Sequence, residues 1–181
     1  MKNKKHMLLT VFMLITVMAA WSQNVSGNLG ETLNLSGQVN GLNGNLEVAY
    51  LGITGFIVEG QFNFTIGTPG DNNLRDIENA FRSILWQSEG TSFSDASARA
   101  VSLYLYIGNG ASIVHATPGF RTAVEYFYVD RDVTINRDSA GNVNAYSLEL
   151  KRGWNAIIRE DWITFTLGDR EDLLWEISQD M

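Results

Sequence analysis

Short stretches of alternating apolar and polar residues recur along the chain, and this alternation constrains the fold more than any other feature. Successive side chains of a β-strand point to opposite faces of a sheet, so alternation is typical of a strand with one buried face. Glycine, asparagine and aspartate, which favour tight turns, separate the stretches. The pattern predicts a mainly β protein, an antiparallel β-sandwich of many short strands.

The clearest alternation runs over residues 56–66 and predicts one strand. Gly60 falls on its core face, where a bulge or close packing is expected. Residues 99–107 and 120–130 are apolar on both faces, which indicates strands covered on both sides, and residues 92–98 between the helix and these strands are expected to form a loop. The core face predicted for residues 56–66 carries Phe56, Val58, Phe62, Phe64 and Ile66.

One amphipathic helix is predicted at about residues 73–87, because apolar residues recur there at helical spacing. The residues Asp71, Asn72 and Asn73 are candidate N-caps. The apolar residues share one face of the helix, and this apolar stripe must be buried against another element. The sheet is the obvious partner. Its apolar residues are Leu74, Ile77, Ala80, Phe81, Ile84 and Leu85.

The N-terminus has the pattern of a secretory signal peptide over residues 1–22. Lys2, Lys4 and Lys5 precede an apolar stretch over residues 7–20. This stretch is shorter than the roughly 20 residues that a membrane-spanning helix needs, which disfavours an anchor. Cleavage after Ser22 leaves 159 residues, the size of one domain. We therefore expect a flexible leader over residues 23–31 and a single β-sandwich domain over residues 32–181.

The chain has no cysteine, so the fold must be stable without disulfides and a lipid anchor at the cleavage site is excluded. An exported domain of this kind is typical of the periplasm or surface of a Gram-negative bacterium. After the signal, 20 acidic and ten basic residues give a net charge of −10. Scattered basic residues make nucleic acid an improbable partner. A protein or glycan of the cell envelope is the expected partner, with no membrane span after cleavage.

Two C-terminal stretches, residues 128–135 (YVDRDVTI) and residues 146–155 (YSLELKRGWN), carry a resemblance. Together they resemble the C-terminal part of small exported β-sandwich proteins of unknown function from spirochaetes and related Gram-negative bacteria, in which a strand ends in a Gly-Trp-Asn turn. The resemblance implies the same fold and export. It implies no activity and no catalytic residue.

Candidate catalytic chemistry is sparse. His115 is the one histidine after the signal, and Ser112 nearby has no nucleophile-elbow motif around it. A zinc site would need several cysteines or histidines. We therefore assign no catalytic residue and no cofactor, and we expect a protein that is not an enzyme. A carboxylate-dependent hydrolase remains an alternative, although the sequence does not single out a pair of acids.

Two weaker hypotheses concern binding. Asp130, Asp132 and Asp138 are candidate Ca²⁺ ligands because they cluster at the ends of one expected hairpin, and a second acidic turn spans residues 169–172. The alternative to Ca²⁺ binding is that these acids are solvated charges on exposed turns. Trp154 is a candidate ligand-binding residue, and core packing is its alternative. The leading hypothesis is a non-enzymatic binding or structural module of the envelope, and the alternative is a carbohydrate- or Ca²⁺-binding module.

Overall fold

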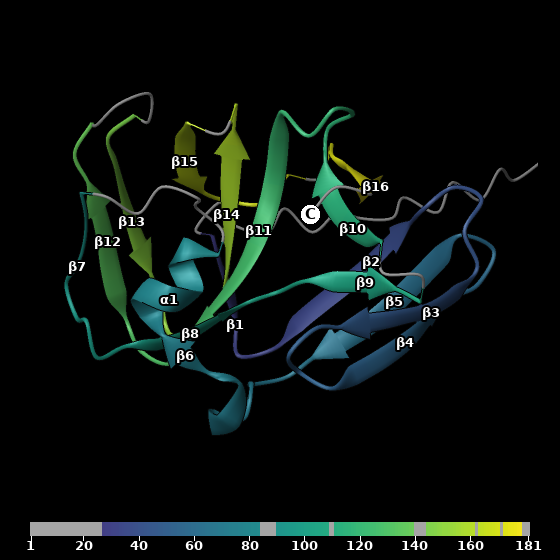
Figure 1. The fold of residues 1–181 in the computed structure, drawn as a ribbon, viewed down its shortest axis with the longest axis horizontal. Helices are drawn as coiled ribbons and strands as arrows, with labels where there is room; N and C mark the ends of the chain where they lie inside the picture. Colours follow the sequence, from purple (N-terminus) through teal and green to yellow (C-terminus); the bar gives the residue numbers. More distant parts are fainter. Residues whose placement is uncertain are drawn as a thin grey trace, which may run out of the picture.

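The computed structural model describes residues 27–83, 90–108, 111–139, 144–161, 163–170 and 172–178 (Figure 1). This part of the chain is mainly β, with antiparallel sheets and one short α-helix, which confirms the predicted β-sandwich. Within the same ranges, no helix is both long enough and apolar enough to cross a membrane. The predicted signal peptide, residues 1–22, lies outside the described residues.

Two long strands, β11 (Thr122–Val129) and β14 (Gly153–Glu160), pair over their whole length in the middle of the largest sheet. From β11 the sheet continues through β10 and β9 to the β3–β4 hairpin, and short strands pair at its margins. Its other strands are β1 (Asn28–Gly30), β3 (Gly44–Val48), β4 (Ile53–Ile57), β6 (Arg75–Asp76), β8 (Arg99–Ser102), β9 (Leu105–Ile107), β10 (Ser112–Ala116), β15 (Thr164–Leu167) and β16 (Leu174–Ser178).

Two smaller sheets cover the largest one, and Figure 1 shows them at opposite ends of the view. One is three-stranded, in the order β13–β12–β7, and the other pairs β2 with β5. The helix α1 lies beside the three-stranded sheet. The bounds are β2 (Leu33–Gln38), β5 (Gln61–Ile66), a 3-10 helix (Asp71–Asn73), α1 (Ile77–Arg82), β7 (Thr91–Phe93), β12 (Val133–Arg137) and β13 (Tyr146–Leu150).

Side chains of β11 alternate between two hydrophobic clusters. Val124, Tyr126 and Tyr128 pack with residues of β2, β3 and β5 in the first cluster. Phe127 and Val129 pack with residues of α1, β12 and β13 in the second. Both faces of β11 are therefore buried, as its sequence predicts, and each fully buried large side chain contributes roughly 1.5–3 kcal/mol.

The helix is shorter than predicted and begins later. Leu74 has an extended backbone, with ψ 140°, and Arg75 and Asp76 pair with β8, so α1 begins at Ile77. The candidate caps, residues 71–73, form a separate 3-10 helix instead. The prediction of helix over residues 73–76 is wrong, and residues 84–87 lie outside the described residues.

Packing explains why the helix starts where it does. Leu74 is buried in the first cluster, whereas Ile77, Ala80 and Phe81 are buried in the second. One straight helical stripe faces one side, so it cannot reach both clusters. The extended segment before Ile77 carries the chain from one cluster to the other.

Residues 56–66 form two strands joined by a tight turn, and the prediction of one strand is wrong. Glu59 and Gly60 have φ values of 52° and 79°, which is typical of a type I′ turn, and Val58 and Gln61 exchange two backbone hydrogen bonds of 2.9 Å. Because the turn has two residues, apolar side chains at even positions before and after it point to opposite faces. Phe56 and Val58 are therefore 68% and 64% exposed, whereas Phe62 is buried.

Two expected irregular segments contain strands. In the flexible leader predicted over residues 23–31, Asn28–Gly30 form β1 and pair with β14. The Asn28 side-chain amide also donates hydrogen bonds to the carbonyls of Lys151 and Arg152. In the loop expected over residues 92–98, Ser92 and Phe93 belong to β7. Both strands are short and sit at sheet margins, where a weak alternation gives no sequence signal.

Candidate functional site

The three candidate Ca²⁺ ligands do not form a metal centre. Asp130 accepts the backbone N–H of Arg99 at 2.9 Å and pairs with the Arg131 guanidinium at 3.1 Å. These contacts outweigh its partial burial and lower the pKa of Asp130. Among the residues that the structure describes, no group of three or more metal-ligating side chains is assembled.

Asp132 and Asp138 are the other two candidate Ca²⁺ ligands, and each has a different environment. Asp132 accepts the backbone N–H of Arg152 at 2.9 Å and the Lys151 ammonium at 3.0 Å, and these bonds lower its pKa. Asp138 is exposed just after β12. The carboxylates of Asp130 and Asp132 therefore act as anchors for neighbouring loops.

Trp154 is not available to a ligand. Its side chain is 0% exposed, lies edge-on to the Tyr128 ring and donates its indole N–H to the Gly67 carbonyl at 3.2 Å. The structure thus places the predicted ligand-binding residue in the first hydrophobic cluster. Trp86 and Trp162 lie outside the described residues.

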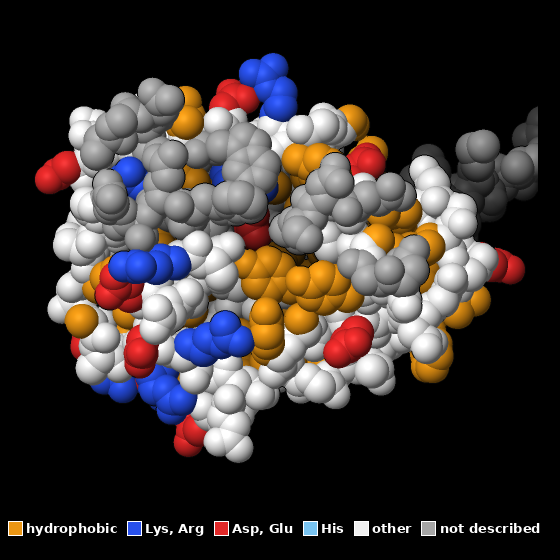
Figure 2. Space-filling model, viewed as in Figure 1, with side chains coloured by type: hydrophobic (Ala, Val, Ile, Leu, Met, Phe, Trp, Pro, Cys, Tyr) orange, Lys and Arg blue, Asp and Glu red, His pale blue; other side chains and the backbone are white. Residues whose placement is uncertain are grey.

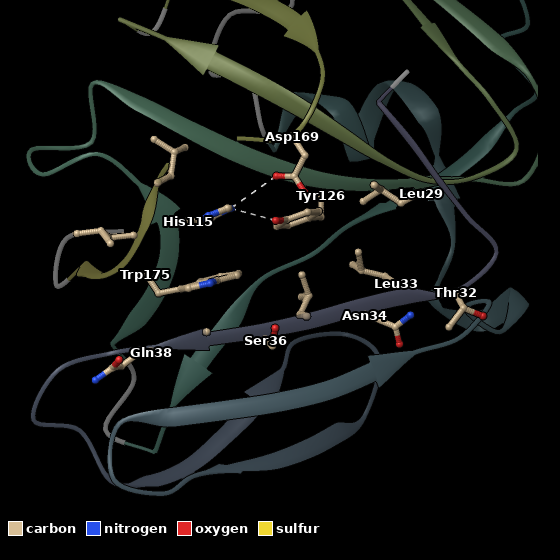
Figure 3. Close-up of a pocket in the computed structure, with 14 residues that line it drawn as sticks. Leu29, Thr32, Leu33, Asn34, Ser36, Gln38, His115, Tyr126, Asp169 and Trp175 are labelled. Atoms are coloured by element: carbon tan, nitrogen blue, oxygen red, sulfur yellow. Dashed lines mark hydrogen bonds and ion pairs between the residues drawn. The ribbon is translucent and has the colours of Figure 1, made fainter. Parts of the chain in front are cut away.

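A cleft of about 460 Å³ opens between β2 on one side and β10, β11 and the β15–β16 connection on the other. We call it the His115 cleft. Leu29, Leu33 and Leu35 supply apolar lining, which we call the leucine floor, and the polar Thr32, Asn34, Ser36 and Gln38 also line the cleft. Figure 3 shows Asp169, His115 and Tyr126, which we call the polar wall, together across the cleft from β2. Trp175 closes one end. Apolar and polar side chains thus both line the cleft, and Asp169 is its acidic group.

Strand register brings the cleft residues together. His115 in β10 lies directly opposite Trp175 in β16, and the two rings stack at 4.8 Å with an angle of 14°. On its other side β10 pairs with β11, where His115 is opposite Val124 and therefore near Tyr126, two residues further along the same face. The His115 Nδ1 and the Tyr126 hydroxyl form a 3.0 Å hydrogen bond.

Gly37 allows Trp175 to pack against β2. A Cβ atom at residue 37 would lie 2.2 Å from Cδ1 of the indole, so any other residue would displace Trp175. The Phe62 ring also meets Trp175 edge-on, at 5.0 Å between centroids. The indole is therefore held between β2 and the His115 ring, and this contact fixes the end of the cleft.

Burial controls the protonation of the polar wall. It lowers the pKa of His115 below the ordinary value of 6.5, and the opposing effects of Asp169, a hydrogen bond to the Leu173 backbone and Asp172 are smaller. Burial also raises the pKa of Tyr126, and the negative charge of Asp169 adds to this effect. Both side chains are therefore neutral at pH 7.

Asp169 is the acidic side chain of the cleft. It is 33% exposed, and its Oδ1 lies 3.9 Å from His115 Nδ1 and 2.8 Å from the backbone N–H of Arg170. The Arg170 guanidinium points elsewhere, to Asp172 at 2.6 Å and Glu160 at 3.6 Å.

Among the residues that the structure describes, no serine or threonine hydroxyl is hydrogen-bonded to the His115 ring. Ser112, the nearby hydroxyl, lies 3.5 Å from the Ser178 carbonyl oxygen, and its hydrogen bond is made there. The Nδ1 atom of His115 instead faces a phenol and a carboxylate. This arrangement suits the binding of a polar group better than acyl transfer.

A second hollow, of about 480 Å³, lies over β8 and β9. Three tyrosines, Tyr50, Tyr104 and Tyr106, line it together with Arg75 and Arg82. The Arg75 guanidinium lies 4.4 Å above the Tyr50 ring, and Figure 2 shows hydrophobic side chains gathered on this face. We call it the tyrosine groove.

Sequence reasoning missed the His115 cleft. Its polar wall is assembled from β10, β11 and the segment before β16, which are distant in the chain, and none of these segments carries a local motif. The sequence contains one indication of the cleft. Val124 and Tyr126 are two residues apart in a predicted strand, so their side chains lie on the same face of the sheet.

The chain matches no known family model, and the searches of curated proteins and of solved structures gave no significant match. The fold and the cleft therefore define the class, which is an antiparallel β-sandwich protein with a half-polar cleft between two of its sheets. The resemblance to exported spirochaetal β-sandwich proteins stays a prediction.

Proposed function

We propose that this chain is an exported, non-enzymatic binding module of the bacterial envelope and that it holds a small molecule in the His115 cleft. The single observation that supports this proposal best is the composition of the cleft. Small-molecule sites are typically concave, largely apolar and supplied with a few convergent polar groups. The leucine floor and the His115, Tyr126 and Asp169 wall have this composition.

A binding role agrees better with the site than hydrolysis does. A carboxylate-dependent glycosidase needs two acids flanking the bond to be cleaved. Of the described residues that line the His115 cleft, Asp169 alone is acidic. Export is supported by the basic and apolar pattern of residues 1–22.

Carbohydrate binding is the second candidate, and the tyrosine groove supports it. Half-exposed aromatic rings stack on the apolar faces of sugar rings, and three tyrosines surround this hollow. Glycan binding would then take place on the face formed by β8 and β9. Titration with soluble oligosaccharides, compared between the wild type and Tyr104→Ala, tests this alternative.

The cleft proposal is tested by filling the cleft. Leu29 points into it and is half-buried, so Leu29→Trp should occupy the space without disturbing a buried position. We expect small ring compounds such as 2-phenylethanol to bind the wild type in calorimetric titrations. Binding should fall at least about tenfold in Leu29→Trp, because the loss of about 1.4 kcal/mol suffices for that factor.

Leu42→Trp is the matched control. Leu42 is also half-buried against the first hydrophobic cluster, but it does not line the cleft. The Leu42→Trp variant should bind the ring compounds with the affinity of the wild type. Equal affinity of Leu29→Trp and the wild type would contradict the proposal, as would the absence of binding by any member of a set of small ring compounds.

A further inference from the structure

The charge of Asp169 has no permanent cationic partner in the His115 cleft. Its carboxylate accepts a hydrogen bond from the Arg170 backbone N–H, which is a neutral donor. Its one ion-pair contact is His115, at 3.9 Å, and the burial of that ring favours the neutral form. Among the described residues, no lysine or arginine lies within ion-pair distance of this carboxylate. A half-buried carboxylate of this kind gains free energy from a cation that enters the cleft.

The basic side chain nearest in sequence is already engaged. Arg170 is bound to Asp172 by two of its nitrogens and also reaches Glu160. These contacts turn its guanidinium away from the preceding carboxylate. Arg170 therefore does not neutralise Asp169, and the carboxylate can accept a cation from solution.

The remaining surfaces of the cleft fit an organic cation better than a metal ion. The Tyr126, His115 and Trp175 rings lie roughly parallel, and aromatic rings attract ammonium groups. The leucine floor offers contact to an apolar body, and the side-chain oxygens that Thr32, Asn34, Ser36 and Gln38 add to the lining are neutral. A metal ion would find one carboxylate here, whereas Ca²⁺ takes six to eight oxygen ligands.

The net charge of the whole molecule also favours the binding of a cation. The chain has a formal net charge of −7, so its field attracts cations and repels anions. This long-range effect is weak at physiological salt and adds to the local one.

We propose that the His115 cleft binds an organic molecule with a protonated amine on an apolar body, the ammonium paired with Asp169 and the body resting on Leu29, Leu33 and Leu35. The inference rests on the proposed function, because it specifies the ligand of the same cleft. The ammonium can donate to the carboxylate while the Tyr126 hydroxyl keeps its bond to His115.

Three probes that differ only in the polar end test the inference: 2-phenylethylamine, 2-phenylethanol and phenylacetate. In calorimetric titrations of the wild-type protein at pH 7.5, the amine should bind about tenfold or more tightly than the alcohol, and phenylacetate should bind least. Asp169→Asn should abolish the preference for the amine over the alcohol.

Asp138→Asn is the matched control, because Asp138 is an exposed acid just after β12 that does not line the cleft, and its removal changes the net charge equally. It should retain the preference for the amine. If the amine and the alcohol bind the wild type equally, or Asp169→Asn retains the preference, the inference is wrong while the cleft remains a binding site. If no probe binds, both proposals fail.

Discussion

The indole of Trp154 illustrates, at the scale of single residues, how a side chain that looks suited to binding serves the core instead. Trp154→Ala should lower the free energy of unfolding by about 3–5 kcal/mol, because it leaves a large cavity and an unpaired Gly67 carbonyl. Urea denaturation measures the change. Trp154→Phe should cost less, since it keeps an aromatic ring in the cluster. A loss below about 1 kcal/mol in the alanine variant would mean that Trp154 is not a core residue.

His115 predicts a pH dependence of stability. Its folded-state pKa is lowered from 6.5 by burial, so the unfolded chain takes up a proton at a higher pH than the folded protein does. The contribution of His115 to stability is therefore complete above pH 6.5 and is lost as the pH falls through the folded-state pKa.

The matched variant for this prediction is His115→Gln. Its free energy of unfolding should change less between pH 8 and pH 5 than that of the wild type. The carboxylates with lowered pKa values, among them Asp130 and Asp132, lose their contributions only as the pH falls below their ordinary value of 3.8. Parallel stability curves for the two proteins from pH 8 to 5 would contradict the assignment of a neutral, buried His115.

Gly60 controls one connection at the scale of secondary-structure elements, that between β4 and β5. Its φ is 79°, and a Cβ atom would lie 2.7 Å from the Val39 carbonyl oxygen. Gly60→Ala should therefore cost about 1–3 kcal/mol in urea denaturation. Gly52→Ala is the control, because Gly52 has a positive φ but open space around it, and it should cost less. Equal costs would show that the close approach to Val39 has no energetic effect.

Several elements were predictable because their burial follows local alternation. The strand predicted over residues 120–130 contains β11, which is buried on both faces, and β12 and β13 form the hairpin expected around Asp138. The turn at Glu59–Gly60 was missed because it conserves alternation in the sequence while reversing the faces in space. The start of α1 was missed because Leu74 and Ile77 pack in different clusters, which is a tertiary property.

The candidate site was less predictable than the fold. The acids that cluster in sequence, Asp130 and Asp132, are paired with Arg131 and Lys151, so their proximity in the chain had a structural cause. The sequence shows that His115 is the one histidine after the signal. Its contacts with Tyr126 and Trp175 depend on the pairing of β10 with β11 and β16. Strand pairing between distant segments is not encoded in any local pattern.

The proposed export concerns the whole molecule and can be tested directly. Expressed with its own N-terminus in a Gram-negative host, the protein should be found in the periplasmic fraction and should begin at Gln23, because the basic and apolar segments precede a small-residue cleavage site. Intact-mass spectrometry of the periplasmic and cytosolic fractions measures this. Recovery from the cytosol with Met1 retained would contradict it.

Ligand binding in the His115 cleft is the central proposal for this protein. Titration of isotope-labelled protein with 2-phenylethylamine, followed by nuclear magnetic resonance, tests this most directly because it locates the bound probe. The largest shifts are predicted at the His115 ring, the Tyr126 ring and the Trp175 indole N–H. Shifts confined to Tyr50, Tyr104 and Tyr106 in the tyrosine groove, or no shift at any of these side chains, would contradict it.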